Sequence, residues 1–90
     1  MKPILWTAYL EYRCQTRNFR LEAIENIIHS PERLYYDVET ARIVAVGKHD
    51  NKLVLIPYEE TETGITPVTI HATSRRQINL RVRSGRFRSP

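Results

Sequence analysis

The feature that most constrains the fold is a run at residues 52–58 that is apolar at almost every position. A strand with one wet face alternates apolar and polar residues, whereas this run has no polar face to turn toward water. We therefore expect a central strand that is covered on both faces, with Leu55 and Ile56 in the core. Pro57 comes near the end of the run, where the loss of a backbone N–H costs least.

Shorter strand patterns on both sides of this run predict a sheet. Residues 34–38 and 42–48 precede it, with turns at 39–40 and 49–51, and residues 65–71 follow an acidic turn at 59–64. Pro67, inside the last of these segments, indicates an edge strand or a bulge. The segments form a meander, so the sequence predicts a four-stranded, mostly antiparallel sheet.

Two helices are predicted before the sheet. The first begins near Thr7, a residue type that caps helix N-termini, and ends at Asn18, which tolerates the left-handed conformation found just past a helix. The second covers residues 20–29, where apolar residues repeat at helical spacing: Leu21, Ile24 and Ile28. The predicted fold class is α+β, with both helices on one face of the sheet.

The C-terminal third of the chain is basic. Glu62 is the last acidic residue, and residues 63–90 contain six arginines and no carboxylate. The net charge of +4 divides into −2 for residues 1–62 and +6 for the remainder. Guanidinium binds phosphate through paired hydrogen bonds and stays charged, so this composition favours a polyanionic partner, either nucleic acid or an acidic protein. The alternative is a solvated, partly disordered segment.

The same third of the chain has an ambiguous pattern. Ile78, Leu80 and Val82 alternate with polar residues as in a strand, but a start at Thr73 or Ser74 also permits a short helix. We favour the helix. Residues 84–90 are expected to be a loosely ordered tail on a single domain that spans residues 1–90.

Composition excludes several protein classes. No apolar run approaches membrane length and no signal-peptide pattern opens the chain, so we expect a cytoplasmic protein without membrane contact. Cys14 is the single cysteine, which leaves no internal disulfide and suits a small buried hydrophobe. His29, His49 and His71 are too dispersed for a zinc site. We expect no metal and no cofactor.

Three polar residues in the first helix are spaced by four: Tyr9, Arg13 and Arg17. On a helix they form one line, and two arginines beside a phenol could clamp a phosphate. The alternative is a surface row that pairs with acids such as Glu11.

His71 is the best candidate for proton transfer. It ends the predicted fourth strand and precedes hydroxyl residues and the pair Arg75 and Arg76. A histidine in such surroundings could act as a general acid or base on a 2′-hydroxyl, although a histidine at a strand end is more typically structural or exposed. Tyr58 is the second candidate, although it and the pair Tyr35 and Tyr36 are more typical of packing groups.

Three segments carry a resemblance to a known family. They are YLEYRCQTRNF at residues 9–19, SPERLYYD at residues 30–37 and PVTIHATSRR at residues 67–76. The first resembles the His-Ala-x-x-Arg-x-x-x-Arg-Gly-Ile helix of small bacterial and archaeal domains, and the last is similar to the closing strand and arginine motif of BrnT-like toxins. The match covers roughly residues 7–78. Tyr9 stands where the family helix has histidine, and Asn18 replaces its glycine.

The resemblance implies a toxin of a type II toxin–antitoxin pair, a small metal-independent endoribonuclease of the RelE/BrnT type that an antitoxin neutralises. It implies RNA contacts by four arginines: Arg13, Arg17, Arg75 and Arg76. A phenol is protonated at neutral pH, so Tyr9 cannot replace a histidine base. Catalysis would then depend on His71, or activity would be lost.

The sequence-based expectation is an RNA-binding protein that cleaves RNA by attack of a 2′-oxygen on the adjacent phosphate. The expected catalytic residues are His71, Arg13 and Tyr58. The expected RNA-binding residues are Arg17, Arg75, Arg76, Arg81 and Arg83. The expected partners are RNA and an antitoxin, with ribosome association and oligomers left open. The alternatives are a non-catalytic module that binds nucleic acid or an acidic partner through its arginine-rich C-terminus, and a structural subunit.

Overall fold

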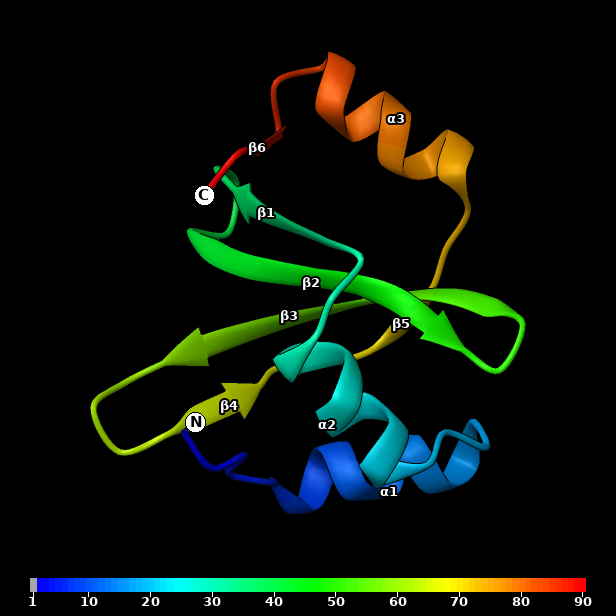
Figure 1. Cartoon of the computed structure of the whole chain (residues 1–90), viewed down its shortest axis with the longest axis vertical. Helices are drawn as coiled ribbons and strands as arrows, with labels where there is room; N and C mark the ends of the chain where they lie inside the picture. The colour runs from blue at the N-terminus through cyan, green and yellow to red at the C-terminus, as the bar shows by residue number, and fades with distance from the viewer. Residues whose placement is uncertain (1) are drawn as a thin grey trace.

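A computed structural model describes residues 2–90 and has the predicted α+β class, with helices packed on an antiparallel sheet (Figure 1). The elements in chain order are α1 (Ala8–Thr16), α2 (Leu21–His29), β1 (Arg33–Asp37), β2 (Arg42–His49), β3 (Lys52–Glu60), β4 (Ile65–Pro67), β5 (His71–Ala72), α3 (Arg75–Arg83) and β6 (Phe87–Arg88). Within the described residues the sheet has six strands rather than the predicted four. No helix in this part of the chain is long and apolar enough to cross a membrane.

The sheet has the strand order β4-β3-β2-β1-β6, and β5 also pairs with β3. The segment predicted as one strand at residues 65–71 is therefore two strands on the same edge of β3. Tyr58 pairs with Pro67 and Leu55 pairs with His71, so three residues, 68–70, stand opposite two residues of β3. This is the geometry of a bulge, as Pro67 predicted, because proline has no N–H to continue the ladder.

The first two helices cover one face of the sheet (Figure 1). The Thr7 hydroxyl accepts the Leu10 backbone N–H at 3.1 Å, and Asn18 has a φ of 60°, which confirms both predicted helix ends. The buried helix residues in this core are Leu10, Cys14, Ile24, Ile27 and Ile28. They pack against alternate strand residues, namely Ala45, Val54, Ile56 and Tyr58.

The opposite face packs against α3, and the side chain of Phe87 from the edge strand β6 lies on the same side. Ile78 of α3 and Phe87 of β6 form a second, smaller core with the strand residues that point to this face, namely Val44, Val46 and Leu55. Leu55 and Ile56 are 6% and 0% exposed and belong to opposite cores. The prediction that β3 is buried on both faces is confirmed.

Residues 84–90, for which a loosely ordered tail was predicted, include the short strand β6. Ser74 caps α3 by accepting the Gln77 N–H, and Gly85, with a φ of 83°, turns the chain back toward the sheet. Phe87 then pairs with Asp37 of β1 and is 3% exposed. Its ring stacks on Tyr35 with centroids 5.3 Å apart. An apolar side chain within a basic segment gains free energy by burial against the sheet, which is how Phe87 holds this segment to β1.

Candidate nucleic-acid interface

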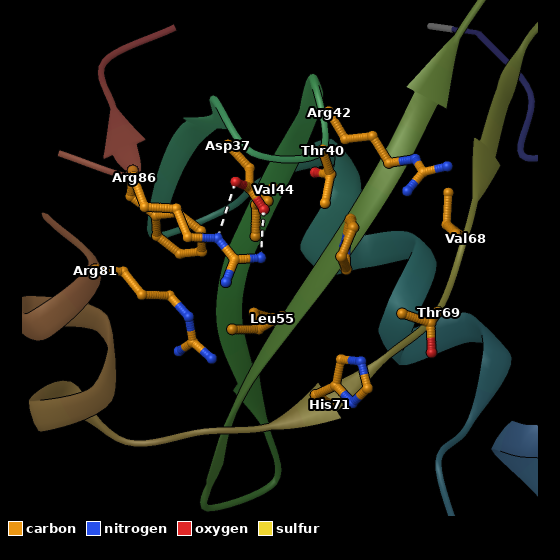
Figure 2. Close-up of a pocket in the computed structure, with 12 residues that line it drawn as sticks. Asp37, Thr40, Arg42, Val44, Leu55, Val68, Thr69, His71, Arg81 and Arg86 are labelled. Atoms are coloured by element: carbon orange, nitrogen blue, oxygen red, sulfur yellow. Dashed lines mark hydrogen bonds and ion pairs between the residues drawn. The ribbon is translucent and has the colours of Figure 1, made fainter. Parts of the chain in front are cut away.

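A cleft of about 220 Å³ lies on the α3 side of the sheet (Figure 2). Its floor is formed by apolar groups: Val44, Leu55, Pro57, Val68 and Phe87. Its rim is polar: Asp37, Thr40, Arg42, Thr69, His71, Arg81 and Arg86. The cleft stays open because α3 buries only Ile78 on this face, whereas the other face packs against two helices.

The rim brings Arg42 together with Arg81 and Arg86, two arginines from the C-terminal part of the chain, around one apolar floor. Arg81 comes from α3 and its Cζ lies 5.6 Å from the centre of the Phe87 ring, as in a cation–π contact. Arg42 begins β2 and its Nε lies 3.4 Å from a Glu59 carboxylate oxygen. Arg86 follows the turn after α3. Asp37 is the one carboxylate that lines the cleft, but Glu59 pairs with Arg42 and a Glu39 carboxylate oxygen lies 3.4 Å from the Arg86 Nε, so Arg81 is the rim arginine without an acidic partner among the described residues.

Asp37 holds Arg86 in place. The Arg86 Nε and Nη2 each donate to one Asp37 oxygen at 3.0 Å (Figure 2), and Asp37 is 3% exposed. Burial alone would raise the pKa of Asp37. Hydrogen bonds from Arg86, the Glu39 backbone N–H and Thr40, together with the Arg86 charge, outweigh burial and lower that pKa. The pair is therefore charged at neutral pH and fixes one guanidinium at the cleft wall.

His71 lies at the rim on β5, in a strongly basic setting. Burial lowers its pKa, and the charges of Arg13, Arg17 and Arg81 lower it further. The Arg13 guanidinium is in direct contact, with Nη2 3.2 Å from His71 Nδ1. Because the pKa lies below that of a free imidazole, His71 is neutral at pH 7.

The structure brings together some of the predicted catalytic residues and separates another. Arg13 contacts His71, and Arg81 lies on the same cleft as His71. Tyr58, by contrast, is 6% exposed in the core beneath α1 and α2. Burial and the nearby Glu60 raise its pKa. Tyr58 shares a face of β3 with Ile56, and alternation points it away from the cleft.

The remaining predicted RNA-binding arginines lie outside the cleft. Arg75 pairs with Glu32 at 2.8 Å, at the N-terminal end of α3. Arg76 and Arg83 are exposed on α3, and Arg17 is exposed at the C-cap of α1. In the predicted line of Tyr9, Arg13 and Arg17, the Arg13 guanidinium contacts the Tyr9 hydroxyl and also reaches the sheet, where its Nε donates to the Ile70 carbonyl.

Two arginines of the rim were not singled out from the sequence. Arg42 had a usable signal, because it lies two residues before Val44 and strand alternation puts both on one face. Arg86 had none, because its position depends on the pairing of β6 with β1, which joins residues far apart in the chain.

No family model, curated protein or solved structure matches this chain. What the cleft can bind follows from its geometry. Guanidinium, imidazole and hydroxyl groups surround an apolar floor, an arrangement that suits an anion carrying a flat or apolar moiety.

Proposed function

We propose that this chain binds RNA in the cleft on the α3 side of the sheet. The observation that carries the proposal is the convergence of Arg42, Arg81, Arg86 and His71 around one apolar floor. A backbone phosphate would accept hydrogen bonds from the rim, while a base or a sugar would lie against the floor. Base stacking and cation–π contacts with arginine are common features of single-strand recognition.

We further propose that the bound RNA is cleaved, in a toxin of the type II class that an antitoxin neutralises. His71 would take the proton of the 2′-hydroxyl as its oxygen attacks the adjacent phosphorus. The bond to the 5′-oxygen would break, that oxygen would take up a proton from His71, and a cyclic phosphate would remain. The rim arginines would stabilise the charge that develops on the phosphate. His71 supports this extension because it is the histidine that lines the cleft.

A second candidate function is RNA binding without cleavage, and a specific observation favours it. Proton transfer needs a free lone pair near neutral pH, and the Nδ1 atom of His71 already faces the Arg13 guanidinium. Asp37 is a weak base because its pKa is lowered, and Tyr58 is buried on the other face. The two functions share the cleft and differ only in chemistry.

Binding is tested with a labelled single-stranded RNA and a matched pair of variants in α3. Arg81→Ala removes a rim arginine, and Arg83→Ala removes an exposed arginine two residues away. Loss of a charged hydrogen bond should weaken binding about tenfold for Arg81→Ala, and by less than about twofold for the control. With three phosphate contacts, log affinity should fall against log salt with a slope of about −2. Equal losses in both variants, or no salt dependence, would refute binding in the cleft.

Cleavage is tested with the same RNA and His71→Ala. Wild-type protein should produce fragments with cyclic phosphate ends. The variant should cleave about 10²-fold more slowly or worse while its affinity changes little. Tight, salt-sensitive binding by wild type with intact RNA after prolonged incubation would establish the second candidate function instead.

A further inference from the structure

Arg13 belongs to α1, which packs on the face of the sheet opposite to α3, yet its guanidinium reaches the rim of the cleft. Its Nε donates to the Ile70 carbonyl at 3.3 Å, and its Nη1 to the Tyr9 hydroxyl at 3.4 Å. Its Nη2 lies 3.2 Å from His71 Nδ1, across 58 positions of sequence. Two of these partners, Ile70 and His71, are consecutive residues, so the planar group is aligned along the chain that enters β5.

The contact fixes the protonation of the imidazole. A guanidinium carries only donors and keeps its charge, so Nδ1 must be the acceptor in this contact. The proton of a neutral imidazole then resides on Nε2. If Nδ1 carried a proton as well, or instead, two N–H groups would face each other at hydrogen-bond distance.

The charges around His71 act in the same direction. Loss of hydration at the ring lowers the pKa of His71, although the residue is exposed on β5, and the charges of Arg13, Arg17 and Arg81 lower it further. The other charged groups of the rim are Asp37, Arg42 and Arg86. The one carboxylate among them is already paired with Arg86, so it offers little compensation to an imidazolium.

We propose that Arg13 is a positioning residue that fixes His71 as the neutral Nε2–H tautomer, so that His71 acts as a hydrogen-bond donor to an anion in the cleft. A proton can be taken up at Nδ1 only when Arg13 leaves it. Nε2 can accept a hydrogen bond or a proton only if the ring proton sits on Nδ1 instead, and this too requires Arg13 to leave Nδ1. That the anion is an RNA phosphate rests on the proposed function. The tautomer of the His71 ring does not depend on that proposal.

The test is ¹⁵N NMR of the imidazole nitrogens of the full chain across pH, without RNA. Wild type should show His71 with a proton on Nε2 and a bare, hydrogen-bonded Nδ1. Arg13→Met should give a mixture of tautomers and an upward shift of the titration midpoint. The control Arg17→Met removes a nearby charge that has no contact with the ring. It should raise the midpoint less and leave the tautomer unchanged.

A second variant, Arg13→Lys, retains the charge without the fork that spans Ile70 and His71, and should also mix the tautomers. A wild-type ring with its proton on Nδ1 would overturn the inference, as would equal behaviour of Arg13→Met and Arg17→Met. RNA titration of the same samples tests the proposed function separately. If RNA fails to bind while the tautomer is as expected, the proposed function fails and the role of Arg13 stands.

Discussion

The two faces of the sheet are built from the same strands but are covered to different extents. Toward α1 and α2, the alternate residues of β2 and β3 pack against two helices and form the larger of the two cores. Toward α3, the other set meets one short helix and one two-residue strand, and part of the apolar surface remains open as a cleft. The first face stabilises the fold, and the second leaves room for a ligand.

The difference comes from what each covering segment contributes. In α2 three isoleucines are buried, whereas in α3 only Ile78 is buried and Arg81 takes part in the rim. Phe87 supplies the remaining apolar cover on this side, with arginines on both sides of it in the sequence. A chain segment that is too basic to close a core can therefore form the wall of an open cleft.

The largest expected effect is a difference in stability between aspartate substitutions at two neighbouring residues of β3. Ile56→Asp places a carboxylate in the larger core without a partner and should prevent folding. Leu55→Asp places it on the cleft floor near Arg81 and Arg86 (Figure 2), so the protein should fold with reduced stability. The apolar run alone predicts severe destabilisation for Leu55→Asp. Circular dichroism with urea titration measures both, and equal loss of folding would remove the distinction between the faces.

A smaller effect is expected at the C-terminal strand. Phe87→Ala should lower the free energy of unfolding by about 4 kcal/mol, since a buried aromatic ring is removed from the second core. Val82→Ala is the control, because Val82 is 41% exposed on α3 and should change stability by less than about 0.5 kcal/mol. If Phe87→Ala were as stable as wild type, residues 84–90 would be the loose tail that the sequence suggested.

The smallest of these effects concerns the pair that fixes Arg86. Asp37→Asn should reduce stability at neutral pH by about 2 kcal/mol through the loss of charged hydrogen bonds. The folded pKa of Asp37 is lowered, so its contribution is present above the unfolded pKa, near pH 4, and is lost as pH falls through the folded value. The difference between wild type and variant should shrink below about pH 4. A difference that is constant down to the most acidic conditions would contradict the ion pair.

Local chemistry predicted the helices and the main strands. Thr7 and Asn18 mark the ends of α1 because capping and left-handed conformations depend on the residue itself. The apolar run predicted the central strand because burial on both faces leaves no polar position. The position of β6 could not be predicted, since Phe87–Arg88 is a strand only where it meets Tyr36 and Asp37.

The site was predictable only in part. The residue types were informative, because arginines near one histidine indicate an anion site, and Arg81 and His71 do lie on one cleft. Their assembly depends on long-range pairing, which brings Arg86 to Asp37 and Arg13 to His71. Tyr58 was assigned to the site by residue type, but the alternation of side chains along β3 puts it on the face that packs against α1 and α2.

The central claim is that RNA binds the face of the sheet that carries α3 and not the face that carries α1 and α2. Amide NMR during titration with a single-stranded RNA tests this claim most directly. The largest shifts should come from the rim, from Thr40, Arg42, Thr69, His71 and Arg81. Amides on the outer surfaces of α1 and α2, such as those of Tyr12 and Glu22, should stay in place. Shifts confined to α1 and α2, or no shifts at low salt, would contradict the claim.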